Sequence, residues 1–345
     1  MESVSNLKKI KVGLMAYGMS GKVFHAPFIE AHPGFQLCAV VERTKNESLN
    51  DYPNIKLYTS IDDLINDTEL ELIIVNTPNY LHYEHTLAAL KAKKHVLVEK
   101  PFTATHQQAK ELFEIAEKND LKLMVYQNRR YSSDFLSVKE ILNSGVLGNL
   151  IELNFRFDRY KAQIGPKKFK EEKYPASGIL YDLGAHILDQ VISLFGKPLK
   201  YFKSSGVYRE NGQVPDFGHL HLVYPNQIHV FITVSMLTAN PIPGIVINGT
   251  KGTFIKPFSD TQEIQSINQI KPNQPEFGIE KPKHCGKLTL AMEDGSFISK
   301  DIPGKKGNML GLFEDVYQHI RNNVSFPITK EEILIQLEIL ESDDN

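Results

Sequence analysis

Short apolar runs alternate with helix-spaced stretches through the first third of the chain. The apolar runs are rich in β-branched residues, which is typical of buried strands, and apolar residues at helical spacing follow most of them. Strands that alternate with helices predict βαβ units and a parallel sheet covered on both faces. The predicted strands are KIKVGLMA (9–16), FQLCAVV (35–41), LELIIVNT (70–77), HVLVEK (95–100) and LKLMVYQ (121–127).

Start and stop signals locate four helices along the chain. Ser60 precedes IDDLIND as an N-cap, and Thr105 followed by Gln108 fits a capping box. Gly145 ends SSDFLSVKEILNSG and Gly196 ends GILYDLGAHILDQVISLFG, because glycine readily takes the left-handed conformation past a helix end.

The pattern changes after about residue 128. IELNFRFDRY (151–160) alternates polar and apolar residues, and residues 199–301 are mainly strand-like, with LHLVYPNQIHVFITVSM (220–236) predicting a hairpin. We expect a long loop over 261–283 and helices near 309–322 and 329–341. The predicted fold is α/β: an N-terminal Rossmann domain with a doubly wound parallel sheet (1–127), then an α+β domain with a large, mainly antiparallel sheet (128–345).

Composition narrows the class of protein further. At roughly 150 residues per domain, 345 residues suggest two domains. Net charge is −2, so no global basic field attracts nucleic acid or an acidic membrane. The two cysteines, Cys38 and Cys285, show no metal spacing. Without a leader-like apolar region or an apolar run long enough to span a membrane, we expect a reduced, cytoplasmic protein.

A glycine loop lies between the first strand and the first helix. It reads Ala16-Tyr17-Gly18-Met19-Ser20-Gly21, with alanine in place of the first glycine of G-x-G-x-x-G. Gly18 lets the backbone approach a pyrophosphate, Gly21 allows close helix packing, and the helix N-terminus offers N–H groups to the anion. The alternative is a glycine-containing turn without a ligand. Ala16 indicates a turn without positive φ at that position.

The second strand should end at a residue that contacts the adenosine ribose. Glu42 could accept hydrogen bonds from ribose hydroxyls, which favours NAD. Arg43, beside Thr44 and Lys45, could instead bind a 2′-phosphate, which favours NADP. We prefer NADP slightly over NAD; the alternative for the two cations is exposed charge on a loop.

Lys100 ends a buried strand, where an open parallel sheet binds its ligands. Thr77, Pro78 and Asn79 occupy the equivalent place on the preceding strand. Desolvation near a positive nicotinamide should lower the lysine pKa toward the range of an acid/base catalyst. The alternative is a lysine that extends from a strand end into solvent.

Asp182 and His186 stand four residues apart on a predicted helix, so their side chains share one face. The alternative is an aspartate near a helix cap and a semi-buried structural histidine. We expect no metal site, because the remaining histidines show no ligand spacing.

These motifs resemble the Gfo/Idh/MocA family of NAD(P)-dependent oxidoreductases over nearly the whole chain. The resemblance rests on Glu99-Lys100-Pro101, YQNRRYSSDFLSVKEI (126–141), FDRY (157–160), YDLGAHILDQVISLFG (181–196) and GTKGTFIKP (249–257). YGMSGKVFHAPF (17–28) is similar to the branch that includes NADP-dependent scyllo-inositol dehydrogenases.

The resemblance implies roles for these residues. Lys100, Asp182 and His186 match the catalytic set: His186 as base, Lys100 stabilising the alkoxide, and Asp182 orienting the substrate or its partners. It implies a cis peptide before Pro101, Glu99 as an anchor near the cofactor, a cyclic polyol or sugar substrate of the inositol or aldose class, and a homodimer or homotetramer. The cofactor-binding set expected is Tyr17, Gly18, Met19, Ser20, Gly21, Glu42, Arg43, Thr77, Pro78, Asn79, His82, Glu99, Lys100 and Asn128.

Several further candidates stay open. Asn128 could contact nicotinamide or substrate. Arg129 and Arg130 could bind substrate or form a salt bridge at the domain boundary, and Tyr160 with Arg159 could line the substrate pocket. His25 could face the cofactor or pack the helix start, and His82 and His85 could be helix-face residues. The substrate-binding set expected is Lys100, Asn128, Arg129, Tyr160, Asp182 and His186.

Three other functions compete with a polyol or sugar dehydrogenase. They are a non-catalytic dinucleotide sensor, a glycosidase that oxidises a sugar transiently on bound NAD, and an enzyme that reduces a non-sugar ketone or imine. A sensor should lack Lys100 or His186, and both are present.

Overall fold

The computed structural model describes residues 8–345, which form two compact units. The first unit contains the chain up to Gln127 and two later segments, residues 262–277 and 309–330. The second contains residues 128–261, 278–308 and 331–345. The sequence predicts a single boundary after residue 127. The structure differs, because residues 262–277 and 309–330 return to the first unit.

The first unit is built on a parallel sheet of six strands in the order β3-β2-β1-β4-β5-β6. The order reverses between β1 and β4, which is where doubly wound sheets bind ligands. Every residue of β4 and β6 is buried, as a sheet covered on both faces requires. The strands are β1 (Ile10–Leu14), β2 (Phe35–Val41), β3 (Lys56–Tyr58), β4 (Leu72–Val75), β5 (His95–Glu99) and β6 (Leu123–Tyr126).

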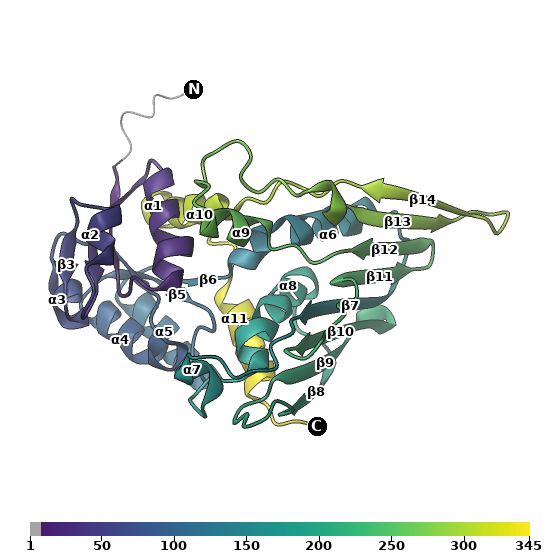
Figure 1. Cartoon of the computed structure of the whole chain (residues 1–345), viewed down its shortest axis with the longest axis horizontal. Helices are drawn as coiled ribbons and strands as arrows, with labels where there is room; N and C mark the ends of the chain where they lie inside the picture. The colour runs from purple at the N-terminus through teal and green to yellow at the C-terminus, as the bar shows by residue number, and fades with distance from the viewer. Residues whose placement is uncertain (1–7) are drawn as a thin grey trace. The chain divides into compact units, whose positions relative to one another are not determined.

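Helices lie above and below this sheet in Figure 1, with α1 and α10 above and α4 and α5 below. Their bounds are α1 (Ala26–Ala31), α2 (Glu47–Asp51), α3 (Ile61–Asn66), η3 (Asn79–Leu81), α4 (His82–Lys91), α5 (His106–Lys118), α9 (Thr261–Ile267) and α10 (Met309–Asn322). The expected caps form in part: Ser60 accepts from the Asp63 amide at 3.1 Å and Thr105 from the Gln108 amide at 3.2 Å. The Gln108 side chain accepts from the Ala104 amide, one residue earlier than a capping box requires.

Aromatic packing explains why two late segments belong to the first unit. Phe28 of α1 stacks on Phe313 of α10, with ring centroids 5.6 Å apart, and meets Phe277 edge-on at 5.8 Å. Phe35 of β2 contacts Phe313 and Tyr317 as well. The apolar face of α1 and β2 is therefore covered by residues from the last quarter of the chain.

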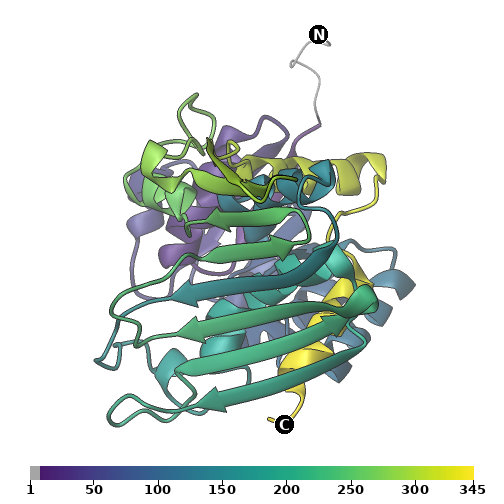
Figure 2. The same ribbon diagram turned by 90° about the vertical axis from the view of Figure 1, so that its right-hand side faces the viewer.

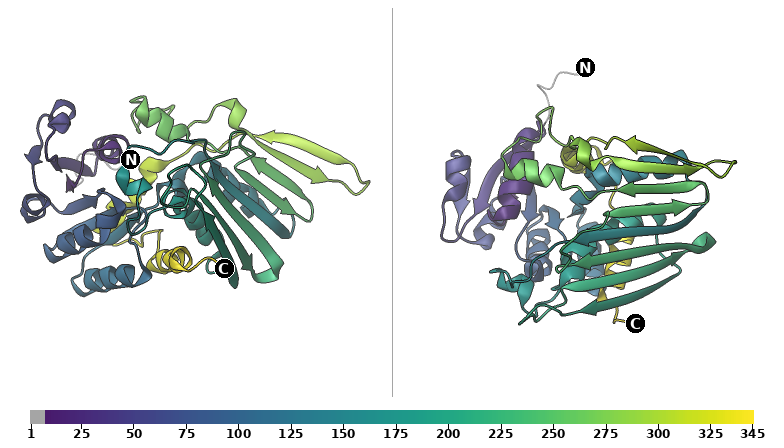
Figure 3. Two further views of the ribbon diagram at one scale, coloured as in Figure 1. Left: turned by 60° about the horizontal axis from the view of Figure 1, so that its bottom comes forward. Right: turned by 45° about the vertical axis from the view of Figure 1, so that its right-hand side comes forward.

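The second unit is built on a mixed sheet of eight strands in the order β14-β13-β12-β11-β7-β10-β9-β8. Only β7 and β10 pair in parallel; the other pairs are antiparallel, and β9 and β10 form the predicted hairpin. Figure 3 shows the strands fanning with the usual twist. The strands are β7 (Leu150–Asp158), β8 (Lys200–Gly206), β9 (Phe217–Tyr224), β10 (Ile228–Ser235), β11 (Ile245–Gly249), β12 (Gly252–Lys256), β13 (Gly286–Ala291) and β14 (Phe297–Ile302).

One face of the large sheet packs against helices and the other is uncovered in this chain (Figure 2). Inward residues alternate with outward ones: Leu220 and Leu222 of β9 are fully buried, while His219 and His221 are half-buried. The helices and turns are η4 (Asn128–Tyr131), α6 (Ser133–Ser144), α7 (Lys168–Glu171), η5 (Leu180–Gly184), α8 (Ala185–Phe195), η6 (Pro225–Gln227), η7 (Pro282–His284) and α11 (Lys330–Glu341). Gly145 and Gly196 end α6 and α8, as predicted; Gly145 is left-handed, whereas Gly196 has a φ of 71° with a ψ of −147°.

Two differences from the sequence expectations concern helices. The stretch 261–283 is not a plain loop, since α9 lies within it and η7 begins at its end. Two helices expected to be regular begin with a π-helical turn: Gly21–His25 (η2) precedes α1, and η5 precedes α8. Within residues 8–345, no helix combines the length and apolarity needed to cross a membrane.

Candidate functional site

The glycine loop lies at the switch point of the parallel sheet. It follows β1, and Asn76, directly after β4, holds its first residue by two hydrogen bonds. The Ala16 amide donates to Asn76 Oδ1 at 2.9 Å, and Asn76 Nδ2 donates to the Ala16 carbonyl at 2.8 Å. The turn takes no positive φ at Ala16, as expected from the alanine. An amide side chain thus fixes the start of the loop.

The two glycines of the loop have different surroundings. A Cβ added at Gly21 would come within 2.5 Å of the Ala16 carbonyl oxygen, so only glycine fits there. A Cβ added at Gly18 would meet nothing within 4 Å. The open space at Gly18 fits a group that approaches the backbone closely, and the Lys22 amide donates to the Gly18 carbonyl at 3.0 Å where the following helical segment begins. These residues therefore fit a dinucleotide pyrophosphate.

Glu99 ties the end of β5 to the glycine loop. Ser20 Oγ donates to its carboxylate at 2.6 Å, and His25 Nε2 lies 2.8 Å from the same oxygen. Burial raises the pKa of Glu99, but the hydrogen bonds from His25 and Ser20 and the Lys100 charge outweigh it and leave that pKa below its ordinary value. His25 is fully buried against Tyr126, with ring centroids 4.5 Å apart. Of the two roles considered for His25, the structure shows packing at the helix start.

His82 connects the ends of β4 and β5. Its Nδ1 lies 2.7 Å from the Pro101 carbonyl and its Nε2 lies 2.9 Å from the Thr77 carbonyl. Burial lowers the pKa of this ring, although both carbonyls favour its protonated form. The Lys100–Pro101 peptide is cis, as the family resemblance implied. His82 is thus a buried residue that joins the segment of Thr77–Asn79 to the segment of Lys100.

Glu42 does not extend freely from the end of β2. Its carboxylate accepts from the Ser48 amide at 2.8 Å, from the Ser48 hydroxyl and from the Glu47 amide at 3.3 Å. It therefore caps the N-terminus of α2 and fixes the loop from Arg43 to Lys45. Arg43 is exposed, and no group in residues 8–345 pairs with its guanidinium. Lys45 forms an ion pair with Glu47 at 3.0 Å.

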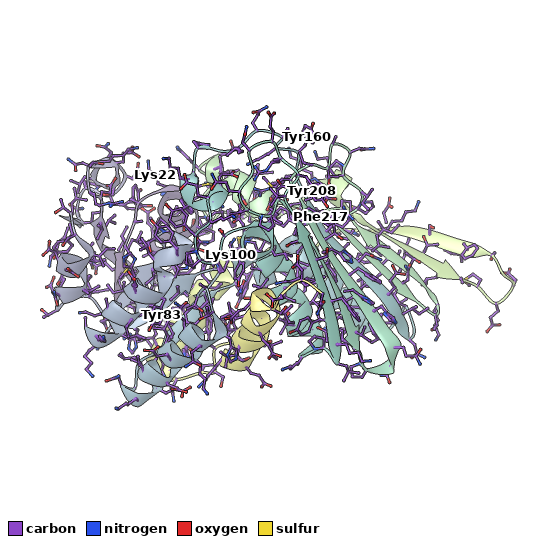
Figure 4. The ribbon with its side chains drawn as sticks, turned by 90° about the horizontal axis from the view of Figure 1, so that it is seen from below. Lys22, Tyr83, Lys100, Tyr160, Tyr208 and Phe217 are labelled. Carbon is purple, nitrogen blue, oxygen red and sulfur yellow. The ribbon has the colours of Figure 1, made fainter. Side chains whose placement is uncertain are left out.

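A polar cluster joins the glycine loop to α2. Tyr17 donates to Asp51 at 2.7 Å, and the Lys22 ammonium lies 5.5 Å from the Tyr17 ring centroid while pairing with Glu47. Burial and the Asp51 carboxylate raise the pKa of Tyr17 far above its ordinary value. The ring stays a neutral phenol beside the expected adenosine end of the site. Figure 4 labels Lys22 and Lys100 on this unit.

In the second unit, Asp182 lies on η5 and His186 follows on α8. The sequence therefore placed both on one helical segment correctly, but Asp182 lies in a π-helical turn at the start of that segment. Both Asp182 oxygens accept from Lys170 Nζ at 2.9 Å, and α7 carries this lysine. The Asp182 side chain is 33% exposed, so the pair is open to solvent.

A small cavity lies beside His186, lined also by Arg129, Arg156 and Gln190. Its volume of about 20 Å³ holds about one water molecule, which is too little for a substrate ring. Arg129 pairs with Asp260, and its guanidinium stacks near Phe157 and Phe258, at 5.4 and 5.5 Å from their centroids. Its side chain is therefore a buried wall of this cavity.

Arg130 forms a two-point ion pair with Asp189, at 2.8 and 2.7 Å, and contacts Glu332. Of the two roles considered for Arg129 and Arg130, the structure shows ion pairs, and they lie inside the second unit. Asn128 is buried at the start of η4, whereas Tyr160 is 62% exposed. No group of three or more His, Cys, Asp or Glu side chains between residues 8 and 345 is placed to hold a metal ion.

The structure thus gathers the expected residues in two places. The first unit brings together the glycine loop, Glu99 and the strand-end residues, and the second brings together Asp182 and His186. Sequence reasoning did not identify Asn76, Lys22 and Lys170. Asn76 directly precedes Thr77 and Lys22 follows Gly21, so their positions beside the motifs were the available signal; Lys170 lies in a segment without one.

Comparison with known proteins agrees with this geometry. Residues 10–127 match the oxidoreductase family with an NAD-binding Rossmann fold, and residues 135–255 match the GFO/IDH/MocA C-terminal domain. The scyllo-inositol 2-dehydrogenase (NADP(+)) IolW of Bacillus subtilis is 34% identical over 96% of this chain and 92% of its own. The D-glucoside 3-dehydrogenase of Escherichia coli is 27% identical over 57% of each chain.

A solved structure supports the same assignment. The crystal structure of a putative oxidoreductase from Bacteroides fragilis superposes with a TM-score of 0.87, at 39% identity over 96% of each chain. The match covers the unit that contains the glycine loop and the unit that contains the large sheet. The chain therefore belongs to the Gfo/Idh/MocA oxidoreductase family.

Proposed function

We propose that this chain is an NAD(P)-dependent dehydrogenase that transfers a hydride between the nicotinamide and a secondary alcohol or ketone of a cyclic polyol or sugar. The observation that carries this proposal is the bond from Ser20 to Glu99 at 2.6 Å. It fixes the residue directly before Lys100 onto the glycine loop. A lysine at the carboxyl end of β5 thus stands in the part of the sheet where a dinucleotide binds.

The proposed cofactor site uses the glycine loop for the pyrophosphate and the loop after β2 for the adenosine ribose. The bound dinucleotide supplies the hydride acceptor or donor. We favour NADP over NAD because Glu42 is engaged by α2, whereas Arg43 is exposed and unpaired among the described residues. A guanidinium in that position suits a phosphate better than a ribose hydroxyl.

The proposed proton chemistry belongs to three side chains. His186 removes the hydroxyl proton, since imidazole titrates near neutral pH. Lys100 donates a hydrogen bond to the same oxygen and stabilises its developing negative charge. Asp182 orients the substrate hydroxyl, and Lys170 holds its carboxylate in place. Of the other candidates, Thr77, Pro78, Asn79 and Asn128 would contact the nicotinamide end, and Tyr160 the substrate.

The substrate class rests on what the relatives are named for. One relative acts on scyllo-inositol and another on D-glucosides, and both are rings rich in secondary alcohols. We therefore place the substrate among inositols, aldoses and their glycosides.

Self-association and a reducing compartment complete the proposal. The uncovered face of the large sheet carries half-buried aromatic rings, with His221 stacked on Phe231 at 4.4 Å and on Phe202 at 5.6 Å. Such a face supports a homodimer or homotetramer. Cys38 and Cys285 are both free thiols, which supports the cytoplasmic setting expected from the sequence.

The test is the ultraviolet absorbance of reduced nicotinamide during incubation with NAD or NADP and a panel of inositols and aldoses. Reduction of one cofactor by one class of ring is the expected result. Bound NAD(P)H without any turnover would contradict the proposal and favour a sensor. Product formation with no net change in absorbance would instead indicate transient oxidation by a retained cofactor.

A further inference from the structure

A separate cavity of about 340 Å³ lies in the second unit, at the end of the large sheet near β7 and β8. Its lining combines apolar and amide side chains: Gln163, Ile164, Tyr208, Asn211 and Leu237. The volume lies within the range of sites for small organic ligands. The site described above does not use this cavity.

Tyr208 forms an aromatic platform in this cavity and is held in place. Its amide donates to Asp216 at 3.0 Å, and its ring meets Phe217 edge-on at 6.0 Å. The ring also lies directly over Gly206, where an added Cβ would come within 2.5 Å of it. Even so, 68% of Tyr208 is exposed. Figure 4 labels Tyr208 and Phe217 beside Tyr160 on this unit.

A fixed and exposed aromatic ring is suited to bind a flat apolar surface. The face of a pyranose ring presents several C–H groups, and the negative face of an aromatic ring attracts them. The side chains of Gln163 and Asn211 add amide donors and acceptors for hydroxyl groups. Neither amide is hydrogen-bonded to another group in the described part of the chain. Tyrosine beside free amides therefore favours a carbohydrate ring as the ligand.

The charges around the cavity exclude an anionic ligand. Arg209 contributes to the lining, but its guanidinium pairs with Glu171 at 2.7 Å and with Asp216 at 3.3 Å. Glu210 adds a further carboxylate to the wall. A phosphate or carboxylate would meet no uncompensated cation here. A neutral ring with hydroxyl groups meets no such penalty.

The cavity is connected to the candidate catalytic residues through α7. Glu171 of α7 pairs with Arg209 in the cavity wall, and the preceding residue, Lys170, pairs with Asp182. Consecutive Cα atoms lie about 3.8 Å apart. The cavity wall and Asp182 are therefore held by adjacent residues of one short helix.

From these contacts, we propose that the cavity is a subsite for a second, non-reacting sugar ring, so that glycosides or disaccharides are better substrates than single rings. The inference rests on the proposed function for its catalytic consequence. Its binding claim is independent of turnover, because the cavity should bind a carbohydrate ring whether or not a reaction follows.

The first test measures binding to the full-length protein by saturation-transfer NMR with cellobiose, maltose and glucose. We expect saturation of both disaccharides, and a loss of at least about fivefold in their signal in Tyr208→Ala, as the removal of one aromatic contact predicts. Tyr208→Phe should retain the signal because the ring remains. Gly206→Ala should weaken it, since the new methyl group displaces the ring.

The control is Phe297→Ala, which removes an equally exposed ring from β14, outside the cavity. Absence of disaccharide binding to the native protein, or equal loss in the Phe297 and Tyr208 variants, would overturn the subsite. Thermal unfolding of each variant shows whether it is folded.

The second test compares kcat/KM for oxidation of disaccharides with that for single rings. Tyr208→Ala should reduce this ratio by about tenfold, because one stacking contact with the second ring is lost. An unchanged ratio would overturn the inference. If no sugar or polyol is oxidised at all, the proposed function fails, whereas a Tyr208-dependent NMR signal would still establish the subsite.

Discussion

Two carboxylates show how differently the two units hold their candidate functional groups. Glu99 in the first unit has a side chain only 14% exposed and receives hydrogen bonds from Ser20 and His25. Asp182 in the second unit is one-third exposed and contacts a lysine that is itself 41% exposed. Buried hydrogen bonds thus hold the Glu99 carboxylate, whereas a solvent-exposed ion pair holds the Asp182 carboxylate.

The difference follows from what each site has to bind. A dinucleotide is one fixed ligand, and Asn76, Glu99 and His82 pre-organise the strand ends around it. Asp182 lies in η5 beside Leu180 and Leu183, which are part of the second unit's core, whereas Tyr208 lies in a loop that follows β8. In the proposed function, the first unit binds the dinucleotide and the second supplies side chains that contact the substrate.

The largest effect should come from the proposed acid/base residues, one in each unit. Lys100→Met and His186→Ala should each reduce kcat by at least about a hundredfold, because the removal of proton transfer or alkoxide stabilisation costs that much. Binding of NAD(P)H, measured by fluorescence titration, should persist in both variants. Near-normal turnover in either one would remove that residue from the mechanism.

A pair of glycine variants tests whether the first unit is as rigid as its contacts indicate. Gly21→Ala should lower the free energy of unfolding by about 1–3 kcal/mol, since its Cβ would press on the Ala16 carbonyl. Gly18→Ala should change that free energy by less than about 0.5 kcal/mol. It should still weaken NAD(P)H binding, because its Cβ occupies the approach to the backbone. Urea denaturation and cofactor titration of the two variants measure both quantities; equal stability would contradict the packing argument.

The two carboxylates can be compared directly by amide substitution. Glu99→Gln should cost about 2 kcal/mol of folding free energy at neutral pH, because two buried hydrogen bonds to a charged group weaken. Asp182→Asn should cost less than about 1 kcal/mol, as for an exposed ion pair. Denaturant unfolding gives both values, and equal costs would remove the contrast between the units.

The pH dependence of Glu99→Gln has a definite sign. The folded protein holds the pKa of Glu99 below its ordinary value of 4.5, so the stability from its ionised form is complete above that value. It is lost as the pH falls through the lower pKa of the folded state. The stability difference between native protein and Glu99→Gln should therefore shrink in acid, and a constant difference would contradict this assignment.

The last prediction concerns cofactor choice. Arg43→Ala should weaken NADPH binding by about tenfold and NADH binding by less than about twofold, since only NADPH carries the 2′-phosphate. Lys45→Ala is the matched control, because Glu47 already neutralises that cation. Fluorescence titration of each variant with NADPH and with NADH measures these changes in affinity. Equal losses for the two would make Arg43 an ordinary surface charge.

Local pattern was enough to predict most of the longer elements of both units, but not β3, α2, α7 or α9. The buried strands, the caps at Ser60 and Thr105 and the helix ends at Gly145 and Gly196 depend on neighbouring residues, so the sequence reveals them. The same holds for the single helical segment of Asp182 and His186. Their π-turn was missed, because hydrophobic spacing does not distinguish an extra residue in one turn.

What could not be predicted depends on contacts between distant parts of the chain. Asn76 holds Ala16 across 60 residues, and Lys170 reaches Asp182 from a segment with no regular pattern. The hydrogen bonds that Ser48 of α2 donates to the Glu42 carboxylate were also missed, because a motif shows only neighbours in sequence. The site was thus predictable in its motifs but not in the side chains that orient them.

The packing of α10 on α1 has a consequence for how the protein is synthesised. The chain is synthesised from its N-terminus. All six strands of the parallel sheet therefore leave the ribosome long before Phe313 and Tyr317 do. Until then Phe28 and Phe35 lack the rings that cover them. The nucleotide-binding unit therefore completes its core only near the end of translation, and a nascent chain stalled before α10 would expose an aromatic surface to chaperones.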